Sequence, residues 1–262
     1  MSASSPLVID ATTVISLLST VAVLGAAYAL SLRVLPRSAS TKARVFFVWH
    51  IFDALIHFLF EGSFLWNCFF VWWAPEPASP YKAGGGSGAV TPLILTPPDV
   101  YFLGRNDRIY GASYGTGPFS QLWQEYAKAD RRWGGADLTV VSLELLTVLV
   151  GGPLALWCAE MVRRGEWYAG REGTEGRKWF WMLVLATAEL YGGWMTFAPE
   201  WLSGSPNLVT DNWMYKWVYL FFFNTLWVWF PLWIAYESYK GITSAMSQRE
   251  VLNVINYLEK KQ

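Results

Sequence analysis

The sequence is poor in charge, in cysteine and in histidine. Only 15% of its 262 residues are charged, against about 25% in a typical soluble domain. The 20 basic side chains balance the 20 acidic ones, which excludes the basic excess by which nucleic-acid-binding domains attract phosphates. Two cysteines are too few for a disulfide scaffold, and two histidines are too few for a multi-histidine metal site. We therefore predict neither a nucleic-acid partner nor a metal.

Long apolar runs indicate a membrane protein. Residues 11–32 carry no charge over 22 positions, and a helix needs about 20 apolar residues to cross a bilayer. No basic segment precedes this run, so it is predicted to be a true span and not a signal peptide. Four more runs follow, at 45–73, 138–162, 179–198 and 215–236. The predicted fold is an all-α integral membrane protein with a bundle of five transmembrane helices.

Basic residues predict the orientation of these spans. Cytosolic loops of membrane proteins are enriched in Lys and Arg. Three segments on one side of a five-span arrangement hold 13 of the 20 basic residues: Arg33, Arg37, Lys42 and Arg44; Arg163, Arg164, Arg171, Arg177 and Lys178; and Lys240, Arg249, Lys260 and Lys261. We therefore predict a lumenal N-terminus at 1–10, a membrane domain at 11–240 and a cytosolic C-terminal tail at 241–262.

Three segments outside the spans have a distinct composition. The Pro- and Gly-rich stretch 74–118 predicts a lumenal loop. The amphipathic, Trp-containing segment 120–133 is expected to lie at the membrane interface or to cap the bundle, and completes a lumenal region at 74–136. The tail 247–262 spaces apolar residues at helical intervals and predicts a cytosolic amphipathic helix. Cys68 and Cys158 are expected near opposite membrane faces, which excludes a disulfide between them.

Ionisable residues inside the predicted spans are the candidates for function, because burying them in a bilayer is costly. His50, Asp53, His57 and Glu61 follow one another at spacings of three and four, which places them on one helix face. The other spans contribute Glu144 with Thr147, Glu189 near Tyr191, and Asn224 with Trp227. Such residues can simply join helices by hydrogen bonds. Their number, among many aromatic residues, favours a ligand pocket instead.

The chemistry of this set is proton transfer. The sequence has no nucleophile motif, no phosphate-binding loop and no cofactor fingerprint, and Lys178 and Lys216 lie at span ends, which disfavours a retinal Schiff base. A metal held by Asp53, His57 and Glu61 is a weaker alternative, because three ligands on one helix face converge poorly. A buried carboxyl that keeps its proton can act as an acid. A carboxylate and an aromatic face can stabilise a cation. Together these features favour isomerisation of a carbon–carbon double bond through a carbocation.

Five segments of the sequence resemble one known family. They are LIHFLFEGSF (55–64), SQLWQEYAKADRRW (120–133), DLTVVSLELLTVLVGGPLALW (137–157), ELYGG (189–193) and FFNTLWVWFP (222–231). These segments are similar to the emopamil-binding protein family, the sterol 8-to-7 isomerases of the endoplasmic reticulum membrane. The resemblance covers about 45–240. It implies an 8-ene sterol substrate, inhibition by cationic amphiphilic amines, a membrane-lipid environment, a homodimer and no cofactor.

The resemblance also implies roles for individual residues. His57 and Glu61 resemble the proton-handling pair of the family, and Glu144 resembles the carboxylate that faces the carbocation. Thr147, Asn224 and Trp227 resemble its supports, with Trp227 offering a ring for cation–π stabilisation. We expect the substrate pocket to include six further residues: Trp123, Tyr126, Glu189, Tyr191, Asp53 and Phe223. Neither His50 nor Asp53 belongs to the family pattern; Asp53 either keeps His57 cationic or pairs with His50.

Two alternatives remain beside the sterol isomerase. One is a non-catalytic membrane protein of the same fold that binds a sterol or another lipid. The other is an isomerase of a different polycyclic terpenoid, since both substrates are large, rigid and apolar. The presence of His57, Glu61, Glu144 and Asn224 favours an enzyme over a binding protein.

Overall fold

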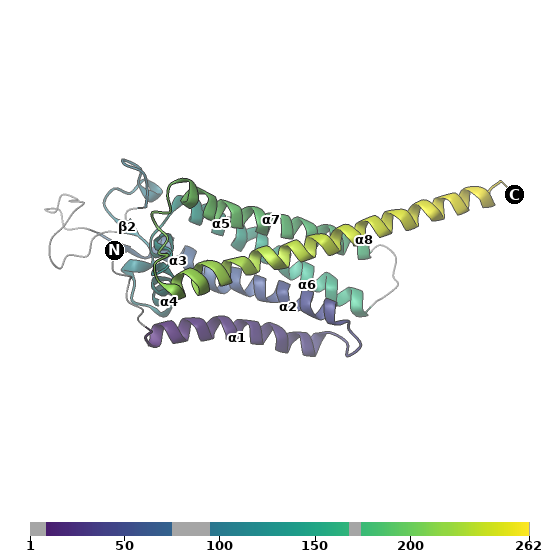
Figure 1. The fold of residues 1–262 in the computed structure, drawn as a ribbon, viewed down its shortest axis with the longest axis horizontal. Coiled ribbons are helices and arrows are strands. Elements are labelled where there is room, and N and C mark those ends of the chain that lie inside the picture. The colour runs from purple at the N-terminus through teal and green to yellow at the C-terminus, as the bar shows by residue number, and fades with distance from the viewer. Residues whose placement is uncertain (1–8, 75–94, 168–173, 262) are drawn as a thin grey trace. The chain divides into compact units, whose positions relative to one another are not determined.

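The chain is mainly helical in a computed structural model that describes residues 9–74, 95–167 and 174–261 (Figure 1). Part of the predicted 74–118 loop and most of the predicted lumenal N-terminus lie outside the described residues. Among the described residues, four helical segments are long and apolar enough to cross a membrane: Ala11–Val34, Thr41–Phe70, Leu138–Glu166 and Tyr215–Glu259. The prediction of a helical protein with several membrane-length helices is thus confirmed.

The fourth predicted span forms a helix but is not among these four segments. Helix α7 covers Thr174–Leu202 and is 29 residues long. It contains several glycine, tryptophan and acidic residues, which lower its hydropathy below that of the other four. The count of five spans and their orientation therefore stay predictions.

The chain divides into two compact units. Unit 1 consists of Met1–Val21, Ile56–Leu149 and Trp194–Asn224, and unit 2 consists of Ala22–Leu55, Val150–Gly193 and Thr225–Gln262. Helices α1 (Ala11–Val34) and α7 contribute residues to both units, and helix α8 (Asn224–Glu259) begins with the last residue of unit 1. Each unit is described by itself.

Apart from its portions of α1 and α7, the described part of unit 1 consists mainly of short helices, and three of these are π-helices. The π-helices are η1 (Ile56–Glu61), η5 (Thr147–Gly151) and η6 (Tyr215–Phe223). The α-helices are α3 (Gly62–Phe70), α4 (Pro118–Ala127) and α5 (Leu138–Leu146), and the 3-10 helices are η2 (Phe102–Gly104), η3 (Ala112–Tyr114) and η4 (Arg131–Gly134). A two-stranded antiparallel ribbon joins β1 (Trp72–Trp73) to β2 (Ile109–Tyr110). The ribbon brings the two ends of the intervening segment together, which the sequence did not predict.

Helix α4 and the turn after it form the core of unit 1. Pro118 begins the helix, where its missing N–H costs nothing. Trp123 stacks on Trp133 at 4.8 Å between ring centroids, and Phe64 packs on both rings. The Trp123 indole N–H donates to the Ser63 hydroxyl at 2.9 Å. The two tryptophans of segment 120–133 therefore fill the unit's core, where they bury apolar area, and do not form an exposed interfacial face.

A buried ion pair fixes the turn that follows α4. Arg132 is 2% exposed and donates to both carboxylate oxygens of Asp130, at 2.9 and 2.6 Å. It also donates to the backbone carbonyl of Thr196, at 2.6 Å. Glu200 lies 3.7 Å from the same guanidinium group. The turn is thereby tied to the C-terminal part of α7.

Unit 2 centres on α2 (Thr41–Leu55), which packs along α6 (Gly152–Trp167) (Figure 1). Phe46 on α2 contacts the ring of Trp233 on α8 at 4.8 Å and that of Trp179 on α7 at 6.3 Å. A Cβ atom at Gly241 would lie 2.4 Å from the Trp179 indole. This close approach explains why a glycine occupies the middle of α8.

Helix α8 runs without a break from the last apolar run into the tail (Figure 1). The sequence predicted an amphipathic helix at 247–262, and the structure is helical there as far as Glu259, as the continuation of α8. Residues 237–250 contain no proline to end the helix. The apolar residues of the tail are exposed: Val251, Val254, Ile255 and Leu258. Both cysteines, Cys68 and Cys158, are free and buried.

Candidate active site

His57 and Glu61 form a close pair on the π-helix η1. His57 Nδ1 lies 2.5 Å from Glu61 Oε2, and the two side chains are 4% and 13% exposed. A π-helix adds one residue to each hydrogen-bonded turn and often marks a functional site. The predicted helical spacing of four thus still brings the imidazole and the carboxyl together, within a widened turn. This geometry allows a proton to pass between them.

Thr147 connects this pair to a second acid. Its hydroxyl oxygen lies 2.7 Å from Glu61 Oε2 and 2.9 Å from Glu144 Oε2. Glu144 belongs to α5, which begins where the Asp137 side chain accepts a hydrogen bond from the backbone N–H of Val140. Thr147 is the first residue of η5. The structure therefore places four of the residues predicted to be catalytic in one chain of hydrogen-bond contacts.

The number of protons in this chain is limited. A threonine hydroxyl has one proton to donate and can accept another hydrogen bond. Two ionised carboxylates would both need that proton, and two like charges at such a distance repel each other. Both contacts of Thr147 are satisfied when one carboxyl is protonated and donates to the hydroxyl. The arrangement can thus hold a proton that moves between Glu61 and Glu144.

Asn224 joins Tyr126 in the same unit. Its side-chain amide nitrogen, which has two hydrogens to donate, lies 2.9 Å from the Tyr126 hydroxyl and 2.9 and 3.0 Å from the backbone carbonyls of Tyr219 and Leu220. The two carbonyls belong to η6, immediately before the chain returns to an α-helix. Asn224 therefore contacts both the junction between η6 and α8 and the side chain of Tyr126. Burial raises the pKa of Tyr126, so its hydroxyl stays protonated at neutral pH.

Aromatic rings surround Tyr126. The ring of Trp123 lies 6.1 Å away and that of Trp133 5.5 Å away, both edge to face. Tyr219 lies at 6.0 Å and stacks on Phe223, another predicted pocket residue, at 6.3 Å. Trp123, Tyr126 and Phe223 thus share unit 1 with the residues predicted to be catalytic.

The remaining predicted residues belong to unit 2. Trp227 on α8 donates its indole N–H to Asp53 on α2 at 2.7 Å. Glu189 and Tyr191 lie on α7, and Tyr191 is 67% exposed. His50 is buried on α2, three residues before Asp53. Of the predicted stripe, His50 and Asp53 belong to α2 and unit 2, and His57 and Glu61 belong to η1 and unit 1.

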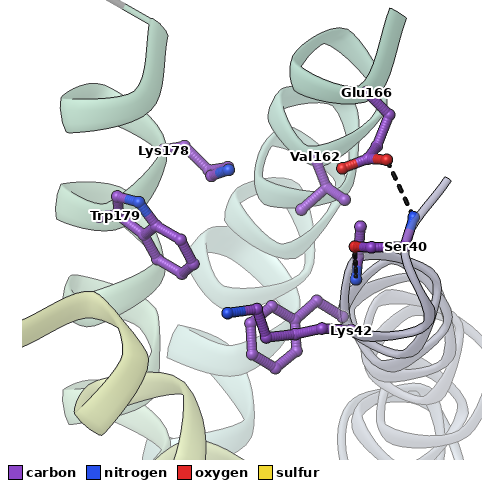
Figure 2. A pocket seen from close by; sticks show the side chains of 8 residues that line it. Ser40, Lys42, Val162, Glu166, Lys178 and Trp179 are labelled. Atoms are coloured by element: carbon purple, nitrogen blue, oxygen red, sulfur yellow. Dashed lines mark hydrogen bonds between the residues drawn. The ribbon is translucent and has the colours of Figure 1, made fainter. Parts of the chain in front are cut away.

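A small cavity of unit 2 contains none of the predicted site residues. The cavity has a volume of about 60 Å³ and is lined by residues of α2, α6 and α7 (Figure 2). Among its lining residues, the Glu166 carboxylate accepts from the backbone N–H of Ser40 at 3.2 Å. The other labelled residues are Lys42, Val162, Lys178 and Trp179. We therefore do not assign the proton chemistry to this cavity.

In the described part of the chain, no group of three or more His, Cys, Asp or Glu side chains is arranged to hold a metal ion.

Some residues next to the site were not predicted from the sequence. Ser63 accepts from Trp123, and Tyr219 donates to the buried Glu125 carboxylate at 2.9 Å. Thr13 of α1 donates to the same carboxylate at 3.0 Å. Glu125 lies in segment 120–133, which the sequence analysis had singled out. Its partners Tyr219 and Thr13 are 94 and 112 residues away along the chain and belong to no motif.

Comparisons with known proteins point to one superfamily. Residues 118–238 match the family described as EBP: EXPERA (EXPanded EBP superfamily). The matched part includes Glu144, Thr147, Asn224 and Trp227, whereas His57 and Glu61 precede it.

Several proteins of known name are similar over about half of the chain. A 3-beta-hydroxysteroid-Delta(8),Delta(7)-isomerase of Cavia porcellus is 30% identical over 128 residues, which are 49% of this chain and 52% of that protein. A probable enzyme of the same name from Oryza sativa subsp. japonica is 29% identical over 133 residues, or 51% and 56%. Isomeliandiol synthase MOI2 of Melia azedarach is 27% identical over 143 residues, or 55% and 57%. The chain spans about half the length of the curated relatives it matches. Residues 118–238 of the chain are thus similar to the EXPERA (expanded EBP) superfamily.

Proposed function

We propose that the protein is a sterol isomerase that moves a ring double bond from the 8-ene to the 7-ene position. The observation that carries this proposal is the hydrogen-bonded chain His57–Glu61–Thr147–Glu144, which can store and transfer a proton. The names of the steroid isomerase relatives support a sterol as the substrate.

The proposed reaction consists of two proton transfers. A protonated carboxyl of the site gives its proton to carbon 9, and the electrons of the C8=C9 double bond form the new C–H bond. A cation remains at carbon 8. Loss of the proton from carbon 7 to a carboxylate then forms the C7=C8 double bond. One proton is added and one is lost, so the reaction needs no electron donor or acceptor.

The side chains take distinct parts in this reaction. His57 and Glu61 exchange protons with the substrate, and Thr147 passes a proton between Glu61 and Glu144 so that the site returns to its starting state. Glu144 faces the cation and stabilises it by charge. Trp227 adds a cation–π contribution of about 1–2 kcal/mol in a desolvated site. Asn224 orients the Tyr126 hydroxyl, beside which Trp123 and Phe223 are further substrate-binding residues. Glu189, Tyr191 and Asp53 are proposed as substrate-binding residues from the sequence alone.

The setting of this enzyme is also part of the proposal. The four membrane-length helices, with α7 as a fifth span, form a multi-pass protein of the endoplasmic reticulum membrane with a lumenal N-terminus and a cytosolic tail. The membrane domain at 11–240 is flanked by the short segments 1–10 and 241–262. Cationic amphiphilic amines bind in place of the carbocation. The active protein is a homodimer.

One observation favours a second candidate substrate. Relatives that match the chain include isomeliandiol synthase and a protoglabretal synthase of Ailanthus altissima, at 27% identity each. Their names support an isomerase of another polycyclic terpenoid, which would use the same proton chain. A purely lipid-binding role has no use for a proton held between two acids, so we rank it last.

An assay in deuterated water tests the proposal. The purified protein is incubated with an 8-ene sterol such as zymosterol, and the product is analysed by gas chromatography and mass spectrometry. We expect a 7-ene sterol with one deuterium at carbon 9. Turnover of a polycyclic triterpenoid with no sterol turnover would support the second candidate. No turnover of either substrate, with an amine ligand still bound, would support the binding protein.

A further inference from the structure

Asp53 and Trp227 make a contact that the family pattern did not predict. The two residues are 174 positions apart, and the Trp227 indole N–H donates to Asp53 Oδ1 at 2.7 Å. Asp53 is 0% exposed and lies in the membrane-length segment Thr41–Phe70. A carboxyl group in such a place is costly and calls for a functional reason.

The indole is also held by its neighbours on α2. The ring of Trp49 lies 5.5 Å from that of Trp227, and the ring of Phe52 lies 6.0 Å from it. Trp49 is in turn stacked on Phe230 at 4.3 Å with an interplanar angle of 7°. Trp227 itself is only half-buried. Its N–H edge is therefore held against α2, and the side chain is not fully buried.

The choice of a carboxyl group as the acceptor is informative. An amide, a hydroxyl or a backbone carbonyl would satisfy an indole N–H equally well. An ionised carboxylate differs by its charge, which strengthens the hydrogen bond. The charge also polarises the indole so that its ring face becomes more negative. Both effects favour a cation over the ring and do nothing for a neutral molecule.

We propose that Asp53 is a positioning residue for Trp227, which holds the indole by its N–H and makes the ring face a stronger binding surface for a cation. The inference rests on the proposed function only in the identity of that cation, which would be the carbocation or the ammonium group of an amine. Asp53 acts through the indole and does not itself exchange protons with the substrate.

A pair of matched ligands tests the inference. One is a lipophilic amine that ends in a protonated dimethylamino group, and the other is its neutral isostere that ends in an isopropyl group. Their affinities are measured for the full-length protein and for Asp53→Asn, Trp227→Phe and the double variant. Asp53→Asn keeps an acceptor but removes the charge, and Trp227→Phe keeps a ring but removes the N–H. Glu160→Gln is the matched control, because its carboxylate pairs with Arg163 and Arg164.

We expect Asp53→Asn to weaken binding of the amine about tenfold, or about 1.4 kcal/mol, and to change binding of the isostere less than twofold. In the Trp227→Phe background the same substitution should change amine affinity less than threefold. Glu160→Gln should change neither affinity. Equal losses of affinity for the amine and the isostere in Asp53→Asn would overturn the inference. A double variant whose loss of amine affinity equals the product of the two single-variant losses would also overturn it.

Two further comparisons keep the test decisive. If Asp53→Asn does not fold, Trp227→Phe alone carries the test, and unchanged selectivity for the amine over the isostere would overturn the inference. Sterol turnover of the unaltered protein is measured in parallel. Selectivity lost in Asp53→Asn without any sterol turnover would reject the proposed function and support the role of Asp53. Normal sterol turnover of the unaltered protein, with unchanged selectivity in Asp53→Asn, would support the proposed function and reject the role of Asp53.

Discussion

Thr147 Oγ1 lies 2.7 Å from Oε2 of Glu61, a residue 86 positions earlier in the chain. The same hydroxyl lies 2.9 Å from Glu144. With one proton to donate, Thr147 can join both acids only when one of them is protonated. A protonated acid and an ionised acid are the two species that a double-bond isomerase needs at the same time.

The first prediction concerns this hydroxyl. Thr147→Val keeps the shape of the side chain and removes the oxygen that joins Glu61 to Glu144. We expect the turnover number for the 8-ene sterol to fall about 100-fold, the lower end of what a general acid–base contact contributes. KM should change little, because the substituted group is not predicted to bind the sterol rings. Initial rates over a range of sterol concentrations measure both quantities.

Thr147→Ser is the control for this substitution. Serine retains the hydroxyl, so its rate should stay within about fivefold of that of the unaltered protein. A Thr147→Val protein with normal turnover would show that no proton passes through this residue. Equal loss in the serine and valine variants would indicate a packing role for the methyl group.

The two acids should respond differently to substitution by glutamine. Glu61→Gln removes a proton donor and acceptor but leaves the cation-facing carboxylate, so turnover should disappear while amine binding stays within about threefold. Glu144→Gln removes that carboxylate, so both turnover and amine affinity should fall, the latter about tenfold or more. Turnover and equilibrium binding of one lipophilic amine measure the difference. Normal turnover in either variant would contradict the assigned roles.

Much of the helical architecture follows from local sequence. Apolar runs of about 20 residues predict membrane-length helices, and four of the five predicted runs lie in such helices. Asp137 caps α5, as expected for an acid at the start of an apolar run. The remaining run, the fourth (179–198), lies in helix α7, whose hydropathy is lower because its glycine and acidic residues weigh against the apolar ones.

Contacts between distant segments could not be predicted in the same way. The spacing of His57 and Glu61 indicated a pair, but nothing local indicated that η1 is a π-helix, since π-turns depend on the packing around them. Asp53 was expected to act on a histidine, and its hydrogen bond from the indole N–H of Trp227 was not predicted. The two residues are 174 positions apart, and a single sequence does not show which residues so far apart are in contact.

Asn224 is predicted to have two separable roles. Asn224→Ala removes the donor to the backbone carbonyls of Tyr219 and Leu220 as well as the donor to Tyr126. We expect a loss of about 1–3 kcal/mol in the free energy of unfolding, the usual cost of buried acceptors without a donor, and reduced turnover. Tyr126→Phe removes the phenol oxygen alone, so turnover should fall about tenfold with a loss of stability under about 1.5 kcal/mol. Unfolding curves and sterol turnover of both variants test this, and equal destabilisation by the two would reject the structural role of Asn224.

The buried ion pair of Asp130 and Arg132 should contribute to stability and not to chemistry. Asp130→Ala leaves the guanidinium buried with Glu200 at 3.7 Å as its nearest acid, so we expect a loss of about 3 kcal/mol in the free energy of unfolding. Replacing both partners, by Asp130→Ala with Arg132→Met, removes the uncompensated charge and should restore part of that loss. Chemical unfolding in detergent micelles, followed by tryptophan fluorescence, measures both changes. A double variant that is less stable than Asp130→Ala would show that Arg132 stabilises the turn mainly through its bond to the Thr196 carbonyl, independently of Asp130.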